Sequence, residues 1–136
     1  MKTSVVVLLV SLTVIANWGS AKTYPELGRV TRIEVRTNDR KNIKTIIEPN
    51  QTSKIVVFVD SQRSGWGGSK DMFGVPVPLV ILDFYAEQDF KGHFGIGDGF
   101  FETQRIGDFA SKSVSEDEEQ ELLNLIGISG ELLRKQ

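Results

Sequence analysis

The chain has 136 residues, with 16 Lys and Arg, 18 Asp and Glu, one His and no Cys. The near balance of charge argues against a nucleic-acid partner. The missing cysteines exclude disulfides, thiolate catalysis and Cys-ligated metals. A single histidine excludes any site that needs two imidazoles from one chain. The length predicts one domain with one hydrophobic core.

The first 21 residues have the layout of a secretory signal. Lys2 precedes an apolar run over residues 5–16, and Gly19 and Ala21 are the small residues before a cut after Ala21. The run is shorter than the ~20 residues that span a bilayer. We therefore expect a signal peptide over 1–21 and one exported domain over 22–136, in the periplasm or the medium, with no membrane anchor after cleavage. An uncleaved anchor or a buried first helix is the alternative.

The first part of the exported domain predicts a hairpin followed by a helix. Ile33 and Val35 alternate with charged residues, turn formers fill 37–42, and a short β-branched run ends at Ile47, so 30–47 is a hairpin. Residues 51–63 favour a helix that is N-capped by Asn50 and has an apolar face. Four β-branched residues over 54–60 favour a strand instead.

The second part predicts three strands in sequence. The apolar run over 79–85 is typical of a central strand that is buried on both faces. Asp98-Gly99 is a two-residue hairpin signal. The other expected segments are a loop over 64–78, a turn over 88–92, strands over 93–97 and 100–105, and a segment over 107–112 that extends or edges the sheet.

The clearest helix begins at Ser115. Ser115 and Glu118 fit a capping box, in which each side chain accepts from a free backbone N–H of the helix start. Acidic residues at 116–119 also suit the positive end of the helix dipole. Gly127 is suited to end the helix. The expected buried stripe is Leu122, Leu123, Leu125 and Ile126.

The resulting order, β-β-α-β-β-β-α, predicts an α+β fold. We expect a two-layer sandwich, with a mainly antiparallel five-stranded sheet and both helices on one face. The pattern resembles that of small exported bacterial proteins with an early hairpin, a Glu-Pro helix entry (Glu48-Pro49), a Gly/Trp loop (66–68) and a closing Leu-rich helix (122–126). This resemblance covers most of residues 30–128 and implies no activity or site residues.

The loop over 64–75 is the most suggestive binding feature. Trp66 has glycines on both sides, and Met72 and Phe73 follow in the same segment. Aromatic and Met side chains on loops are typical of recognition surfaces. The alternative is that Trp66 and Phe73 cap the core. The leading hypothesis is a non-catalytic exported domain that binds an envelope or extracellular protein and needs no cofactor.

An enzyme is the alternative from a different class. Neither Gly-x-Ser-x-Gly nor Ser-x-x-Lys occurs in the chain. A small secreted hydrolase or metal-dependent enzyme would have to use His93 with nearby carboxylates, although a strand points alternate side chains to opposite faces. We expect no metal site. A structural or stress-related protein without a ligand is a third possibility. The candidate carboxylates are Asp83, Glu87, Asp89 and Asp98.

Overall fold

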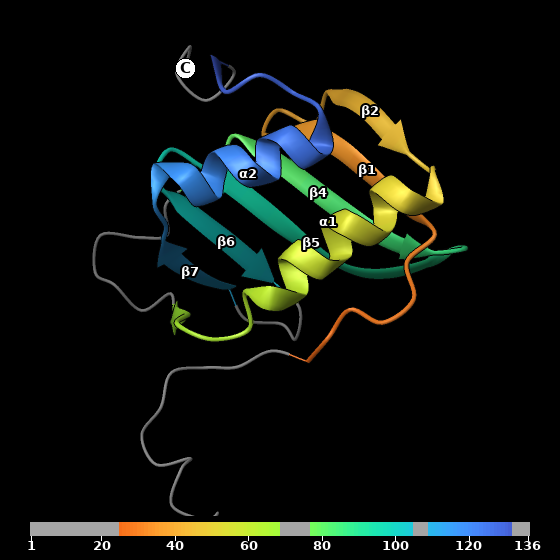
Figure 1. The fold of residues 1–136 in the computed structure, drawn as a ribbon, viewed down its shortest axis with the longest axis horizontal. Helices are drawn as coiled ribbons and strands as arrows, with labels where there is room; N and C mark the ends of the chain where they lie inside the picture. Colours follow the sequence, from red (N-terminus) through yellow and green to blue (C-terminus); the bar gives the residue numbers. More distant parts are fainter. Residues whose placement is uncertain (1–24, 69–76, 105–108, 132–136) are drawn as a thin grey trace, which may run out of the picture.

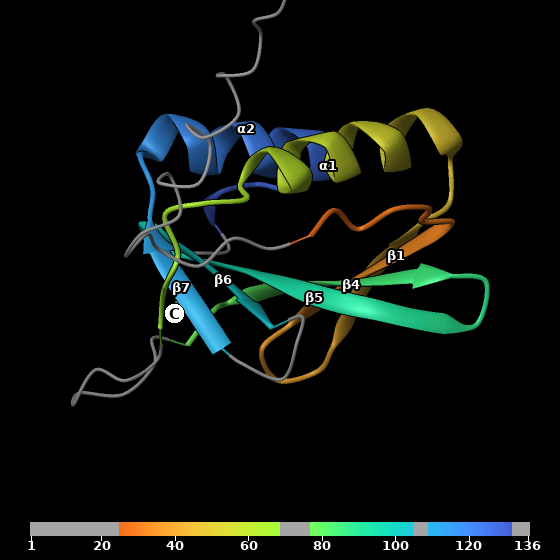
Figure 2. The ribbon, with the colours of Figure 1, turned by 90° about the horizontal axis from the view of Figure 1, so that it is seen from below.

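A computed structural model describes residues 25–68, 77–104 and 109–131. The chain forms two layers, with an antiparallel sheet below and two helices side by side on one of its faces (Figures 1 and 2). This confirms the α+β sandwich and the placement of both helices. The sheet order is β2-β1-β4-β5-β6-β7-β3.

In the part of the chain that the structure describes, the sheet has seven strands where five were expected. One addition is β7 (Phe109–Ser113), which forms where the sequence suggested an extension of the sheet. The other is β3 (Gly67–Gly68), which lies inside the expected loop over 64–78 and pairs with β7. Two glycines give no strand signal, because they carry no side chain that could alternate between the faces.

The N-terminal hairpin and helix are confirmed. β1 (Arg32–Thr37) pairs with β2 (Asn42–Ile46), and α1 covers Pro49–Ser61. The N-cap is Glu48 rather than Asn50. Its carboxylate accepts from the backbone N of Asn50 at 3.0 Å and of Gln51 at 2.7 Å. The reason is that Pro49 takes the first helical position, for which its fixed φ is suited.

The expected turn over 88–92 is wrong. β4 covers Val80–Ala86, and the chain already reverses at Glu87-Gln88, so that β5 extends over Asp89–Gly97. Glu87 adopts a φ of 55°, which is the left-handed conformation that a tight hairpin turn requires. The next hairpin is confirmed. Gly97 pairs with Phe100 across Asp98-Gly99, and β6 covers Phe100–Gln104.

The closing helix α2 covers Glu116–Ile126 and has the expected ends. The Ser115 side chain accepts from the backbone N of Glu118 at 3.1 Å in a capping box, and Gly127 ends the helix with a φ of 85°. Two side chains from other elements bond the last carbonyls of α2. Lys44 Nζ of β2 donates to Ile126 O at 3.0 Å, and Gln51 Nε2 of α1 donates to Leu125 O at 3.0 Å.

The core lies between the helices and the sheet. Phe94 is at its centre, with ring centroids 5.0 Å from Phe101 and 5.9 Å from Trp66. Alternate residues of each main strand face the helices, and the residues between them face the opposite side. In the described ranges, no helix is long and apolar enough to span a membrane. The aromatic and large aliphatic side chains with less than 2% exposure include Phe84, Phe94, Phe101, Ile33, Ile55, Leu82, Ile96, Leu122, Leu123 and Ile126.

Candidate functional site

The face of the sheet opposite the helices, which we call the polar face, carries a row of polar side chains. Strand register places Glu34 opposite Asp83, Asp83 opposite His93, and His93 opposite Gln104. These residues alternate with core residues of the same strands, because successive side chains point to opposite faces. The polar face is thus the place where the described chain brings charged side chains from several strands together.

Arg36 and Asp83 form the first ion pair of this face. Arg36 Nε donates to Asp83 Oδ2 at 2.6 Å, and Arg36 Nη2 approaches Oδ1 at 3.4 Å. The side chain of Asp83 is only 10% exposed. A carboxylate so far removed from water needs such a partner, because an unpaired buried charge is costly. Asp83 is therefore occupied by Arg36.

His93 and Glu102 form the second pair. His93 Nε2 lies 3.0 Å from Glu102 Oε1, and the Glu102 side chain is 4% exposed. Thr103 Oγ1 donates to the carbonyl oxygen of His93 at 3.0 Å and ties β6 to β5 at the same point. A carboxylate that orients an imidazole is one component of acid–base sites, and it is also a common way to satisfy a buried carboxylate.

The structure does not bring the predicted carboxylates together around His93. Asp83 lies opposite His93 but bonds Arg36. Glu87 is at the β4–β5 turn, where both of its carboxylate oxygens bond Arg29. That hydrogen bond lowers the pKa of Glu87 and raises the pKa of Arg29. Asp89 begins β5, and Asp98 lies in the β5–β6 turn, at the two ends of the strand.

Glu102 is the partner of His93 that sequence reasoning missed. The signal was present in the Asp98-Gly99 turn. A two-residue turn fixes Gly97 opposite Phe100, and two further steps place Gly95 opposite Glu102. Glu102 is then the diagonal neighbour of His93 on the same face. Proximity in sequence favoured Asp89 and Asp98, whereas register selects Glu102.

No group of three or more His, Asp or Glu side chains in the described chain is arranged to hold a metal ion. The pairing of side chains on the polar face accounts for this absence. Asp83 and Glu102 lie on either side of His93, but Arg36 binds one carboxylate and His93 binds the other. The acidic side chains of this row are thus paired with cations or with the imidazole.

Trp66 is a core residue. Its side chain is 2% exposed, its ring stands edge-on to Phe94, and its indole N–H donates to the carbonyl oxygen of Gln62. The alternative in which Trp66 caps the core describes it correctly, and the ring offers no surface to a partner. Met72 and Phe73 lie outside the described residues, so their proposed binding role stays a prediction.

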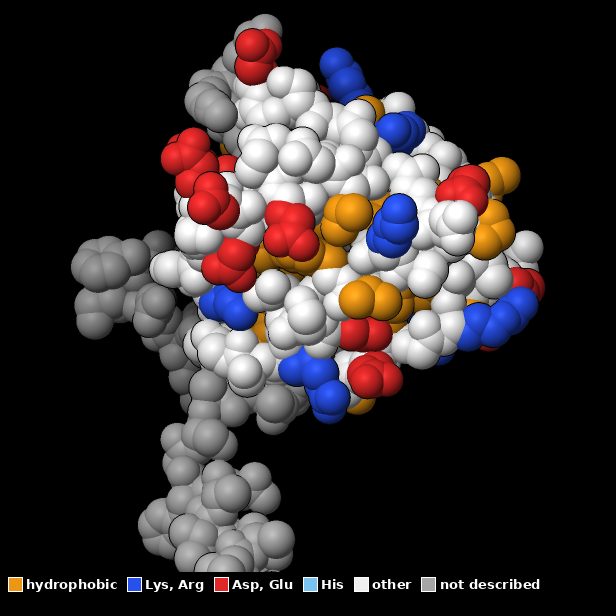
Figure 3. Space-filling view, in the orientation of Figure 1, with side chains coloured by type: hydrophobic (Ala, Val, Ile, Leu, Met, Phe, Trp, Pro, Cys, Tyr) orange, Lys and Arg blue, Asp and Glu red, His pale blue; other side chains and the backbone are white. Residues whose placement is uncertain are grey.

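An apolar groove lies between α1 and α2 on the outer surface of the helix layer. It has a volume of about 470 Å³. Figure 3 shows hydrophobic side chains gathered along and between the helices on this side of the molecule. Val57 is 66% exposed beside Phe58 and Leu125, and Lys54 and Glu121 lie at the rim. A second hollow of about 260 Å³ adjoins α1 on its other side and also includes Val57.

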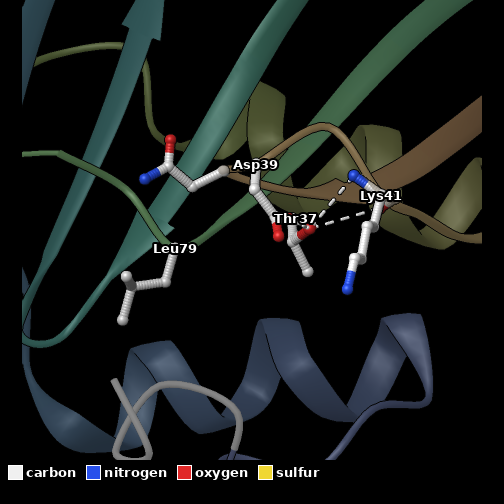
Figure 4. A pocket seen from close by; sticks show the side chains of 5 residues that line it. Thr37, Asp39, Lys41 and Leu79 are labelled. Atoms are coloured by element: carbon white, nitrogen blue, oxygen red, sulfur yellow. Dashed lines mark hydrogen bonds between the residues drawn. The ribbon is translucent and has the colours of Figure 1, made fainter.

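A third hollow of about 270 Å³ lies beside the β1–β2 turn (Figure 4). Its wall consists of Thr37, Asn38, Asp39, Lys41 and Leu79. The Thr37 hydroxyl donates to Asp39 and lowers the pKa of that carboxyl. The same hydroxyl also bonds the backbone N and O of Lys41, and these bonds explain the geometry of the turn.

Comparisons with known proteins add no relative. No family model matches the chain, and no curated protein and no solved structure is similar to it at a significant level.

Proposed function

We propose that this chain is an exported, non-catalytic domain that binds another envelope or extracellular protein in the groove between α1 and α2. The observation that carries the proposal is Val57, an apolar side chain on the solvent side of a helix. Ile55 and Val59 are fully buried against the sheet. Val57 is two residues from each, about 200° around the helix, and is 66% exposed.

Packing against the sheet does not require an apolar residue at position 57. A helix that covers one face of a sheet needs an apolar stripe on one side and polar residues on the other. Residues 55–59 are apolar without interruption. Exposed apolar surface that lines a hollow, with polar residues at its rim, is typical of a binding surface.

The groove favours a partner that inserts apolar side chains. Phe58 and Leu125 form its apolar walls, and Lys54 and Glu121 offer one charge of each sign at the rim. Partners of this chemistry include an amphipathic helix, which places several apolar side chains in one groove. Export, which we expect from residues 1–21, would place that partner in the envelope or the medium.

The test is affinity capture with the tagged full chain, from envelope and medium extracts of the organism that makes it. Val57→Ser removes the exposed apolar side chain of the groove. Phe90→Ser is the matched control, because Phe90 is also an exposed apolar residue (56%) but lies in β5. We expect a partner that is retained by the wild type and by Phe90→Ser and is weakened at least about tenfold by Val57→Ser, the size of an interface contact worth ~1.4 kcal/mol.

Equal retention by Val57→Ser and wild type would contradict the groove. Circular dichroism of both variants checks that the fold is intact. Sequencing the N-terminus of the protein recovered from the envelope or the medium tests export separately. A new N-terminus at Lys22 is expected, and an intact Met1 in the recovered protein contradicts the predicted cleavage.

A second candidate, a small secreted hydrolase, is favoured by one observation. His93 Nε2 lies 3.0 Å from Glu102, and a carboxylate in this position can orient a general base. The test is a screen of ester, peptide and glycoside substrates with the wild type and His93→Gln. Turnover that His93→Gln abolishes supports this candidate. Turnover that survives the substitution, or no turnover, opposes it.

A further inference from the structure

β2 forms one edge of the sheet, since β1 is its neighbour on one side only. Figure 1 shows it at the rim, beyond β1. An edge strand presents backbone N–H and C=O groups that can pair with another strand. Within the described ranges, the other edge is β3, whose two residues offer little backbone for pairing. The two edges of the sheet are therefore unequal, and β2 is the one that can accept a strand.

β2 has no free charged side chain to guard it against pairing. Lysine is a frequent guard of edge strands, and Lys44 is the only charged residue within β2. Its ammonium group lies at the C-terminal end of α2, where it donates to Ile126 O at 3.0 Å. Two isoleucines are exposed instead, Ile43 at 36% and Ile47 at 68%. The register shift opposite Val35 and Arg36 leaves Ile43 without a cross-strand partner on β1.

The charges around β2 are complementary to a reversed copy of the same segment. Arg40 and Lys41 precede the strand, and Glu48 follows it as the N-cap of α1, all three exposed. Asp39 lies further back in the turn, where the Thr37 hydroxyl bonds it. An antiparallel pair of such segments puts the positive start of each copy beside the negative end of the other. A parallel pair would put like charges together, which is unfavourable.

We propose that β2 pairs antiparallel with β2 of a second copy, about a two-fold axis at Thr45, so that two sheets become one continuous sheet. This register puts Ile43 opposite Ile47 of the second copy and Thr45 opposite Thr45 of the second copy. The pairing is isologous, so the same surface serves both copies and the assembly closes at two. It leaves the groove between α1 and α2 outside the contact and does not depend on the proposed function.

The absence of cysteine from the chain permits a direct test with Thr45→Cys. Directly opposed residues of an antiparallel pair have Cα atoms ~4.5–5.5 Å apart, which suits a disulfide. Under mild oxidation at low concentration, we expect the full chain with Thr45→Cys to form a covalent dimer. Phe90→Cys, an exposed position in β5, is the control and should stay mainly monomeric. Equal cross-linking of the two variants overturns the proposal.

Sedimentation equilibrium of the cysteine-free chain supplies the second readout. We expect the wild type to be a dimer that dissociates on dilution, and Ile47→Lys to raise the dimer Kd at least tenfold because it places a charge in the new pair. Phe90→Lys should leave the Kd unchanged. A wild type that is a monomer at every concentration overturns the proposal. This holds even if β2 of that monomer pairs with an added extended peptide, because the partner of β2 would then not be a second copy of the chain.

Discussion

The two faces of the sheet are built from the same strands and are stabilised in different ways. β5 gives Phe94 and Ile96 to the helix side, and His93 and Gly95 to the polar face. The helix side is held by apolar contact among residues that are almost fully buried. The polar face is held by pairs of charged or ionisable groups. Burial is not confined to the helix side, since Asp83 and Glu102 are 7% and 3% exposed.

Two glycines of β5 allow other residues to pack closely on the polar face, which neither α1 nor α2 covers. A Cβ on Gly95 would lie 2.7 Å from the Cβ of Pro78, so Pro78 packs directly on the backbone of β5. The ring of Phe100 covers Gly97 in the same way. Close approach of this kind is possible because glycine has no side chain. Pro78 and Phe100 thus cover β5 on the polar face in place of a helix.

The largest effect should come from the helix side. Trp66→Ala removes a large side chain that is 2% exposed, and we expect a loss of about 3–5 kcal/mol in the free energy of unfolding. Urea denaturation followed by circular dichroism measures it. Trp66→Phe is the matched variant and should lose less, because it keeps a ring against Phe94. A cost near zero for Trp66→Ala would place the ring outside the core.

An intermediate effect should come from the polar face. Arg36→Leu leaves the Asp83 carboxylate buried without its guanidinium, and we expect a loss of about 1–3 kcal/mol, discounted because Arg36 is partly exposed. Asp83→Leu in the same chain should recover much of this loss, since replacing both members of a buried pair is often neutral. Denaturation of the two single variants and the double variant closes the cycle. Additive losses would mean that the pair is not coupled.

The smallest effect should come from the rim of the sheet, at the exposed pair of Arg29 and Glu87. Its hydrogen bond lowers the pKa of Glu87 in the folded chain. The unfolded state therefore binds the proton more readily, and the stabilisation present at neutral pH is lost as the pH falls through the acidic range below ~4. Glu87→Gln should be slightly less stable than the wild type at pH 7, and this difference should shrink as the pH falls through the acidic range. A difference in stability between the two proteins that grows as the pH falls would contradict the lowered pKa of Glu87.

Much of the fold could be predicted from the sequence because local signals agreed with one another. Ser115, Glu118 and Gly127 mark both ends of α2. The helix over 51–63 had conflicting signals, and the requirement to cover the sheet decides in its favour. The failures came from groups without a strong local preference. β3 consists of two glycines, and the β4–β5 turn uses Glu87 in a left-handed conformation that non-glycine residues seldom adopt.

The candidate sites were harder to predict because they depend on register and on the relative placement of elements. The pairing of His93 with Glu102 follows from counting across the Asp98-Gly99 turn, whereas the groove follows from the placement of α1 beside α2. The sequence shows an uninterrupted apolar run over 55–59 but does not show which member is left outside. For Trp66, the sequence allowed both a surface and a core position, and only packing distinguishes them.

The bonds from Lys44 and Gln51 to the end of α2 have a consequence for the order in which the chain folds. Lys44 and the carbonyl that it binds are 82 residues apart in sequence. During synthesis β2 and α1 emerge long before α2, so this corner of the molecule stays incomplete until α2 is available. Closing so long a loop costs entropy before its contacts form. α2 thus completes a corner of the molecule that β2 and α1 begin.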